Sequence, residues 1–518
     1  MTERLWRPWG APGLLVAGTF AFSGAWLVAR AASSGVPHDI AITMLGLAAA
    51  LIAAVAVARW RLGIYLLLLW LVLEDLPRKF LGNDLLVYFG KDVLAFAVYL
   101  GFFLDVRSSH RQPFRPRFFL PLLLFAGICC VQIFNPNSPS PLYALLGLKL
   151  YLYYVPLALL GYALVRTEQD LRRFLAFNLA LGAVVAAIGI VQGVVGPGFL
   201  NPAVTPEQLN LLRLVRRAPL TGEAVPRPTA IFVSDGRFAW YMLSTLFLGL
   251  AAVAYAMARA KPLRTLAVIT LTLVAGAILL SGSRGTFLYG FGSLFVFAAA
   301  LLWGFAVSAR PRRTIGRAAA GAALAVGGSV LAAAILFPDA VGARWAFYYQ
   351  TIAPWSPASE LAYRGQQYPV AEFVKAFSYP HWALGNGIGT ASLGVQYLTS
   401  VFDVTTTGAA VESGYGTLVV EMGLAGLIAW FMWTVSLVGE GLGVVRALRG
   451  SPLFPVAFGF LWFAFVLLFP LTYGGMQPYH NFVFNAFLWL LVGVLFRLPR
   501  LELAPAVTSP VLTAVVAT

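Results

Sequence analysis

Long apolar runs recur along the whole sequence, and they constrain the fold more than any other feature. A helix of about 20 apolar residues crosses the hydrocarbon core of a bilayer. Hydrophobic residues make up 60% of the 518 residues and charged residues only 11%, which leaves too little polar surface for soluble domains. We count fourteen runs, of which the third and fourth are short with polar edges, centred near residues 12–30, 40–58, 62–76, 92–106, 118–134, 148–165, 174–195, 238–258, 265–281, 285–307, 317–336, 415–438, 453–471 and 480–497.

All of these runs are expected to be helical. An open strand edge in lipid leaves backbone groups without hydrogen bonds, and a barrel sequence alternates over segments of about ten residues instead of forming solid apolar blocks. The sequence therefore predicts an all-α fold, a polytopic membrane helical bundle of about 12–14 transmembrane helices. No internal repeat divides the chain, so we expect a single integral-membrane domain over residues 1–518.

The charges are distributed unevenly between the two sides of the predicted bundle. With the N-terminus inside, 22 of the 36 basic residues but only six of the 20 acidic residues fall in inner segments. This distribution follows the positive-inside rule and places both termini in the cytoplasm. The formal charge of +16 then faces anionic membrane lipid, and it gives no reason to expect nucleic acid as a partner.

Two outer segments, residues 196–237 and 337–414, are too long to be simple connections. The second contains aromatic and apolar residues at helical spacing, which predicts an amphipathic helix at the outer membrane surface. Function is therefore expected on the outer side. The spaced residues are Tyr363, Tyr368, Val370, Phe373, Val374 and Phe377.

Arginines in these outer regions run against the charge bias. Those of the first outer segment either pair with acids of the same loop (Glu207, Glu223 and Asp235) or bind an anionic ligand through their planar guanidinium groups. Arg284 lies between two apolar runs with almost no polar spacer, so it is either a functional residue or a turn residue that reaches the lipid headgroups. The arginines of the first segment are Arg213, Arg216, Arg217, Arg227 and Arg237.

Two titratable residues stand at outer helix ends. Glu412 opens an apolar run, where a carboxylate either favours the helix dipole or acts as a general base. His480, at the start of the last run, is either an interfacial hydrogen-bonding residue or the base itself. Residues 385–390, Gly-Asn-Gly-Ile-Gly-Thr, lack the strand and lysine of a phosphate loop and predict a tight turn. No grouping has metal-ligand spacing, so no metal and no cofactor are expected.

Four local motifs resemble those of the O-antigen ligase and polymerase family of bacterial inner-membrane glycosyltransferases. The segment 227–232, Arg-Pro-Thr-Ala-Ile-Phe, resembles Arg-x-x-Gly-x-Phe, and 281–285, Ser-Gly-Ser-Arg-Gly, is similar to Ser-x-Ser-Arg-Gly. Arg364, Pro380 and residues 385–389 resemble an Arg…Pro-x-x-Gly-x-Gly loop. Residues 412–426 resemble His-Asn-x-x-Leu-x-x-Leu-x-Glu-x-Gly-Leu-x-Gly. The matches span residues 225–427.

The resemblance implies a metal-independent transferase of the inner membrane that acts at the periplasmic face on a glycan carried by undecaprenyl diphosphate. It implies that arginines bind the lipid diphosphate and that a loop residue, Glu412 here, activates the acceptor hydroxyl. The acceptor would be a glycan or a lipid, and a chain-length regulator or export machinery would be a partner. The positions expected to bind substrate are Arg227, Arg284, Arg364, Arg237, Asp235, Tyr415 and His480.

The chain departs from the family pattern at three positions. Ala230 replaces a glycine, Asp235-Gly236 stands where an asparagine often follows, and Glu412 replaces the histidine of the ligases. These departures favour a polymerase of repeat units, with ligation to lipid A core or another acceptor as the alternative. A lipid-linked oligosaccharide flippase is an alternative of another class. A flippase should show two related halves and charges near mid-membrane, and neither is evident in this sequence.

Overall fold

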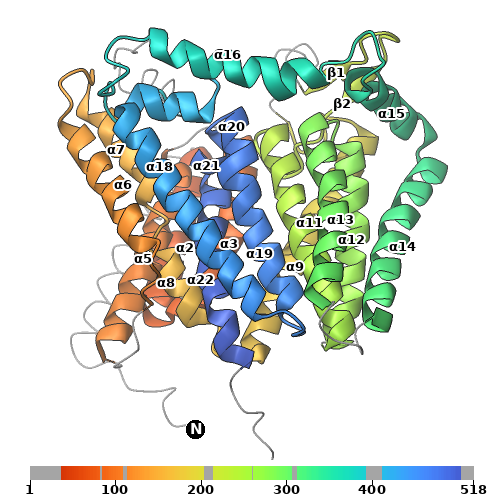
Figure 1. The fold of residues 1–518 in the computed structure, drawn as a ribbon, viewed down its shortest axis with the longest axis horizontal. Helices are drawn as coiled ribbons and strands as arrows, with labels where there is room; N and C mark the ends of the chain where they lie inside the picture. The colour runs from red at the N-terminus through yellow and green to blue at the C-terminus, as the bar shows by residue number, and fades with distance from the viewer. Residues whose placement is uncertain are drawn as a thin grey trace, which may run out of the picture. The chain divides into compact units, whose positions relative to one another are not determined.

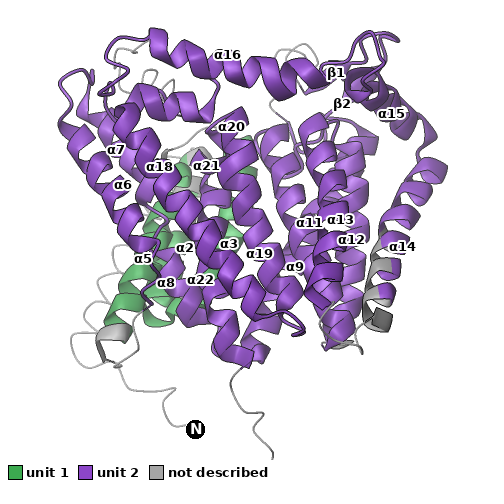
Figure 2. Cartoon of the chain, viewed as in Figure 1, with its two compact units in different colours: residues 1–111 green, residues 112–518 purple. Residues whose placement is uncertain are grey.

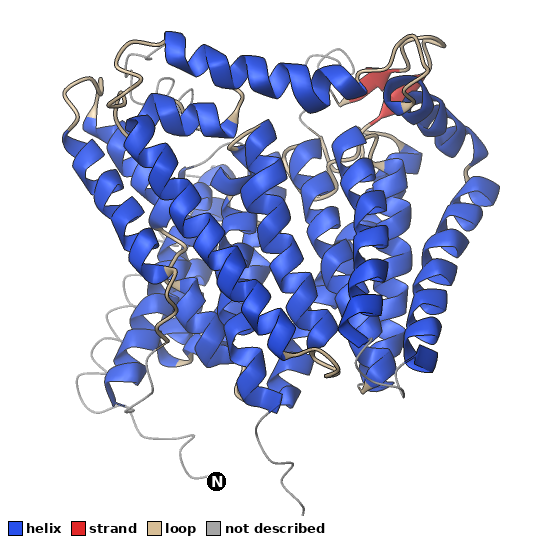
Figure 3. Cartoon of the chain, in the orientation of Figure 1, coloured by secondary structure: helices blue, strands red, loops and turns tan. Residues whose placement is uncertain are grey.

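The computed structural model describes residues 37–81, 85–108, 114–202, 214–259, 261–305, 312–392 and 411–502. The chain is 78% helical and has almost no strands, and a single two-stranded hairpin is present among the described residues (Figure 3). The prediction of an all-α helical bundle is confirmed.

The chain divides into two compact units, residues 1–111 and 112–518 (Figure 2), a division that the sequence analysis did not predict. In the first unit α2, α3 and α5 pack on one another. The buried ammonium of Lys91 lies 3.1 Å from the Glu74 carboxylate, so each charge is compensated by the other inside this group of apolar helices. The helices are α2 (Pro37–Ala58), α3 (Trp60–Leu73), α4 (Asp75–Leu81) and α5 (Leu85–Ser108).

The second unit contains the remaining helices and the hairpin (Figure 1). In chain order these are α6 (Phe119–Val131), η1 (Gln132–Phe134), α7 (Pro141–Leu152), α8 (Leu157–Leu164), α9 (Glu168–Val195), β1 (Val215–Arg217), β2 (Ala224–Pro226), α11 (Asp235–Ala258), η2 (Lys261–Leu263), α12 (Arg264–Leu280), α13 (Arg284–Phe305), α14 (Arg312–Leu336), α15 (Pro338–Ile352), η3 (Tyr363–Gln367), α16 (Tyr368–Lys375), η4 (Ala376–Ser378), α18 (Gly414–Ala447), α19 (Phe454–Val466), η5 (Leu467–Leu471), α20 (Thr472–Gly474), α21 (Gln477–His480) and α22 (Phe482–Glu502).

Every predicted apolar run from residue 40 onward coincides with a helix or a consecutive helix pair, and the first run, 12–30, lies outside the described residues. Within the described residues, eight helices are long and apolar enough to cross a membrane, or nine if the bent pair α14–α15 forms one span. Four shorter apolar helices accompany them. The protein is therefore a multi-pass membrane protein.

Buried aromatic residues on helices that pack together form much of the core of the second unit. α22 packs against α8, α18 and α19, and α11 packs against α9, α12 and α19. Trp489 of α22 stacks on Trp433 of α18 with ring centroids 5.5 Å apart, and both side chains are fully buried. Such large buried apolar groups fix which helices are neighbours.

One end of the second unit carries both long outer segments, and we call it the loop end. The alternating directions of α9, α11, α12 and α13 bring the end of α9, the start of α11, the end of α12 and the start of α13 to the loop end (Figure 1). The hairpin and α15 pack there as well. α14 and α15 meet at an angle of 118°, and the predicted surface helix is present as η3, α16 and η4, crossing the loop end (Figure 1).

Candidate functional site

The hairpin and the turn between α12 and α13 pack directly against each other. Gly282 has a φ of 62°, and a Cβ at this position would lie 3.3 Å from Arg227 Cγ and 3.2 Å from Val225 Cγ1. Glycine permits both the left-handed conformation and the close approach. The Ser-Gly-Ser-Arg turn therefore brings Arg284 next to the hairpin that carries Arg227.

Two carboxylates pair with the arginines of this region. Asp235, at the start of α11, forms an ion pair with Arg227, as in the interpretation that loop acids pair with loop arginines. Glu360, which precedes η3, lies 2.9 Å from Arg284 Nη1 and 3.3 Å from Arg364 Nε through the same oxygen, Oε2. The contact with Arg284, and after it that with Arg364, lowers the pKa of Glu360 below its ordinary value.

A fourth arginine, Arg216 of β1, belongs to the same group. Burial, followed by the positive charges of Arg227 and Arg284, lowers its pKa to about 10. The sequence did not single out Arg216 among the arginines of its loop. We call these four arginines with their two carboxylates the arginine cluster: Arg216, Arg227, Arg284, Arg364, Asp235 and Glu360.

A buried arginine that the sequence analysis missed holds the backbone of this region. Arg344 of α15 is 1% exposed. Its guanidinium donates to Leu280 O at 2.7 Å, to Pro226 O at 2.8 Å and to Gly193 O at 3.1 Å. These carbonyls lie at the ends of α12 and β2 and in the last turn of α9, so one side chain joins the segments that lead to Arg284 and Arg227. A lone arginine in an apolar helix is the signal that could have found it.

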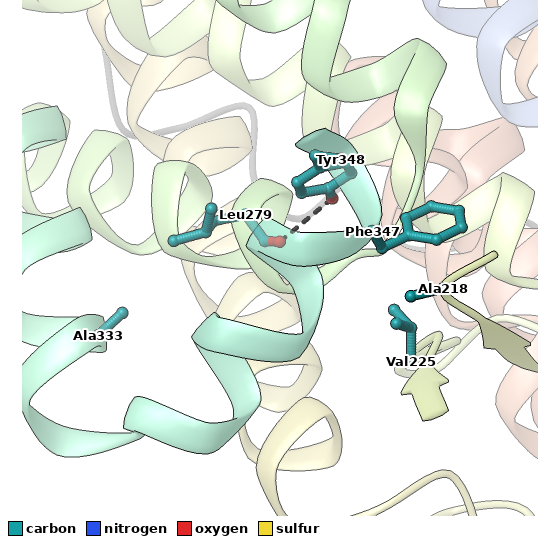
Figure 4. Packing of buried hydrophobic residues seen from close by; sticks show 6 residues of the cluster. All are labelled: Ala218, Val225, Leu279, Ala333, Phe347 and Tyr348. Carbon is teal, nitrogen blue, oxygen red and sulfur yellow. Dashed lines mark hydrogen bonds between the residues drawn. The ribbon is translucent and has the colours of Figure 1, made fainter. Parts of the chain in front are cut away.

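An apolar cluster beside Arg344 fixes α15 over the hairpin (Figure 4). Phe347 and Tyr348 of α15 pack with Val225 and Leu279, and the Tyr348 hydroxyl donates to Leu279 O at 3.2 Å. The guanidinium carbon of Arg284 lies 5.6 Å from the Phe347 ring centroid. This packing holds α15 against the hairpin and beside Arg284.

The segment after Arg227 is fixed by a buried glutamine. Gln192 Oε1 accepts hydrogen bonds from the backbone N–H groups of Thr229 and Ala230, at 2.7 and 2.6 Å. Ala230 has a φ of 49°, a left-handed conformation that costs a non-glycine residue about 1–2 kcal/mol. The position where the resembling motif carries glycine is thus one that glycine suits.

Glu412 reaches the arginine cluster through Tyr368. The Arg364 guanidinium lies 4.9 Å from the Tyr368 ring centroid. A hydrogen bond to Glu412 raises the pKa of the Tyr368 hydroxyl to about 12 because the carboxylate favours the protonated phenol. Glu412 is exposed, and its backbone N–H donates to the Glu372 carboxylate at 2.9 Å.

The other predicted substrate-binding residues lie elsewhere at the loop end. Arg237 lies over the Phe482 ring, 5.0 Å from its centroid. The Tyr415 hydroxyl donates to Phe469 O at 3.3 Å. His480 is buried, its Nε2 has no hydrogen-bond partner among the described residues, and burial lowers its pKa to about 3. A neutral, enclosed imidazole is poorly placed to contact a bulky substrate.

The predicted turn at residues 385–389, which we call the glycine loop, binds to a break in α18. Gly423 has φ 70° and ψ −167° and separates two helical parts of α18. A Cβ on Gly385 would lie 2.5 Å from the carbonyl oxygen of Glu421. The carboxylate of Glu421 is buried and accepts from Ser392 Oγ at 2.6 Å, the Ala391 N–H at 2.9 Å and Tyr151 Oη at 2.9 Å.

An apolar crevice lies between α11, α19 and α22. Trp240 and Phe484 line its part nearest the loop end, since they follow the starts of α11 and α22 by only a few residues. The walls are almost entirely apolar. The other lining residues are Leu243, Ser244, Phe247, Phe463, Val466, Leu467 and Leu471.

Comparison with protein-family models, with curated proteins and with solved structures finds no match to this chain. Within the described ranges, no group of three or more His, Cys, Asp or Glu residues is placed to hold a metal ion. Within the described residues, several guanidinium groups from separate segments meet at the loop end of a multi-pass membrane protein, and planar guanidinium groups suit anionic oxygens as ligands.

Proposed function

We propose that this protein is a glycosyltransferase of the bacterial inner membrane that uses an undecaprenyl-diphosphate-linked oligosaccharide as donor at the periplasmic face. The favoured reaction is polymerisation of repeat units, and transfer to lipid A core or another acceptor is the alternative. The motif resemblance motivates the proposal. The positive-inside distribution of charge supports the periplasmic orientation of the loop end.

The convergence of the arginine cluster carries the proposal. Arg227, Arg284 and Arg364 come from three segments far apart in the sequence; Asp235 pairs with Arg227, and Glu360 bridges Arg284 and Arg364. Four arginines against two carboxylates leave an excess of positive charge. A diphosphate diester, with one negative charge on each phosphoryl group, matches that excess. The apolar crevice begins close to the same end.

The proposed reaction moves one proton and exchanges one bond. The acceptor hydroxyl oxygen attacks the anomeric carbon of the donor glycan, the carbon–oxygen bond to the diphosphate breaks, and the lipid diphosphate leaves. Guanidinium groups stabilise the charge that develops on the leaving group. Glu412 takes the hydroxyl proton, since it is exposed and joined to the cluster through Tyr368. Ala230 supports the motif assignment because its φ of 49° is one that glycine adopts without strain.

Replacement of Arg284 tests the proposal. The protein is placed in nanodiscs with lipid-linked oligosaccharide extracted from the same cells, and product length is followed on gels. Arg284→Ala should lower the rate roughly 10²–10³-fold, and Arg284→Lys should also be impaired because lysine lacks the planar fork. Arg217→Ala is the matched control, since Arg217 is an exposed arginine of the same hairpin.

The outcomes separate the alternatives. A ladder of lengthened glycans indicates a polymerase, and a single addition to a lipid acceptor indicates a ligase. Near-normal transfer by Arg284→Ala at equal expression would exclude the proposed role of the cluster. Transfer should proceed equally in EDTA and in Mg²⁺, and activity that EDTA abolishes and Mn²⁺ restores would reveal a metal requirement.

A further inference from the structure

We propose that Glu360 is an internal competitor of the donor: its carboxylate occupies the guanidinium groups of Arg284 and Arg364 in the empty protein, and a diphosphate displaces it on binding. The inference rests on the proposed function, because it concerns the same anion site. It assigns to Glu360 a role in the exchange of ligands, while the arginines remain the groups that contact substrate.

The bridging geometry is the first observation. A single oxygen, Oε2, contacts both Arg284 and Arg364, at 2.9 and 3.3 Å. Without an anion between them, two neighbouring guanidinium groups repel each other. The Glu360 carboxylate therefore holds the position that an anionic phosphoryl oxygen would take between the same two side chains.

The second observation is a difference in burial. The Glu360 side chain is 38% exposed and the Arg284 side chain only 17%, so the carboxylate can move into water at small cost while Arg284 stays enclosed. Glu360 is also held through its backbone, because its N–H donates to Thr351 O at 2.9 Å and its carbonyl accepts from the Arg364 N–H at 2.8 Å. Release of the side chain therefore need not unfold the turn.

The third observation is that two arginines have guanidinium N–H donors that are not fully hydrogen-bonded. Arg284 Nη1 lies within ion-pair distance of Glu360 but lacks a hydrogen bond of good geometry, and Arg227 Nε has no hydrogen-bond partner among the described residues. Both atoms are buried. A diphosphate offers more acceptor oxygens than one carboxylate does, so it can satisfy donors that Glu360 and Asp235 leave open.

Displacement of Glu360 would connect the donor site to the proposed base. Arg364 lies in η3 and contacts the Tyr368 ring, and Tyr368 contacts Glu412. When Glu360 leaves, Arg364 is released toward the diphosphate, and its contact with Tyr368 changes with it.

Binding of inorganic pyrophosphate to the full-length protein in nanodiscs tests the inference by calorimetry. Glu360→Gln keeps the size of the side chain and removes the competing charge. The Kd of this variant for pyrophosphate should therefore fall roughly three- to tenfold, the range expected for the loss of two partly exposed ion pairs. Glu223→Gln removes an exposed carboxylate from the hairpin that carries Arg216, and this variant should bind pyrophosphate like the unaltered protein. The affinity of Glu360→Gln for farnesyl diphosphate should rise by the same factor, because Glu360 competes with the diphosphate group alone.

Thermal unfolding with and without pyrophosphate gives a second readout, because a merely structural role would not make the pyrophosphate-induced rise in Tm larger in the variant. Glu360→Gln should lower the Tm of the empty protein, since the arginines then repel, and pyrophosphate should raise the Tm of the variant more than that of the unaltered chain. Glu360→Ser serves in the same assay if the glutamine variant does not fold.

The outcomes distinguish this inference from the proposed function. An unchanged or weaker affinity of Glu360→Gln, with binding abolished in Arg284→Ala, overturns the competitor role and leaves the arginine site intact. If Arg284→Ala binds pyrophosphate and transfers glycan normally, or if neither the unaltered protein nor Glu360→Gln binds pyrophosphate, both fail.

Discussion

The arginine cluster and the glycine loop both contain residues of the recognised motifs, and both sit at the loop end, yet their polar groups are bonded in different ways. In the arginine cluster each carboxylate is partly exposed: 16% for Asp235 and 38% for Glu360. At the glycine loop the Glu421 carboxylate is fully buried and accepts from three donors of the protein.

This difference in burial and bonding separates motif residues that can exchange their partner for a ligand from motif residues that stabilise the fold. A partly exposed ion pair contributes little to stability and is easily exchanged for another ion. A buried carboxylate with several donors is costly to disturb, because its loss leaves those donors unpaired. We therefore expect substitutions in the arginine cluster to change activity far more than stability, and substitutions at the glycine loop to do the reverse.

The largest effect is expected for Glu412→Gln. The amide cannot take the proton of the acceptor hydroxyl, so the rate of glycan transfer should fall roughly 10²–10⁴-fold. Because Glu412 is exposed, the Tm should stay the same, and binding of the lipid-linked donor should persist. Glu412→His should recover part of the rate. Normal transfer by Glu412→Gln together with an inactive His480→Ala would assign the base to the last helix.

Arg344→Lys should have the next largest effect. Lysine keeps the charge but cannot reach Leu280 O, Pro226 O and Gly193 O together. The segments carrying Arg227 and Arg284 should shift, and a misplacement of about 1 Å lowers the rate up to roughly 10²-fold. Arg449→Lys is the control, since Arg449 donates to one backbone carbonyl, Trp303 O. Transfer kinetics as fast as those of the unaltered protein would show that α15 does not position the arginines.

Glu421→Gln should change stability more than chemistry. A glutamine amide group donates where the carboxylate accepts, so at least one of Tyr151, Ser392 and the Ala391 N–H loses its acceptor. The free energy of unfolding should fall by about 1–3 kcal/mol, as measured by thermal or denaturant unfolding in detergent. The exposed Glu502→Gln should change it by less than about 0.5 kcal/mol. A stable Glu421→Gln protein without activity would contradict the contrast drawn here.

The smallest effect is expected for Ala230→Gly. Glycine removes the left-handed strain of this position, at a φ of 49°, while it increases the entropy of the unfolded chain. The free energy of unfolding should stay constant or rise by up to about 1 kcal/mol. Ala252→Gly, in the middle of buried α11, should lower it by at least about 1 kcal/mol. An equal decrease in the free energy of unfolding of both variants would show that Ala230 is not strained.

The sequence predicted most of the helices because the information is local. An apolar run of about 20 residues is helical wherever it lies in a membrane, and each predicted run from residue 40 onward coincides with helical structure. The surface helix was also predictable, since its aromatic residues repeat at helical spacing. The first run, 12–30, and the sidedness of the membrane remain predictions.

The partners of the charged residues were not predictable in the same way. The sequence offered Glu207, Glu223 and Asp235 as partners for the first-loop arginines, and of these Asp235 is paired with Arg227. Glu207 lies outside the described residues. Nothing in the pattern distinguished Glu360, which is far from Arg284 in the chain and lies 2.9 Å from it in space.

The sequence by itself thus determined the all-α membrane class, the positions of most helices and the motif residues, because hydropathy, charge bias and short motifs depend on neighbouring residues. Only the tertiary structure decided that Arg344 joins three segment ends, that Gly423 breaks α18 and that one carboxylate bridges two arginines. Those contacts depend on which helix ends meet, and the packing of side chains far apart in the sequence decides that.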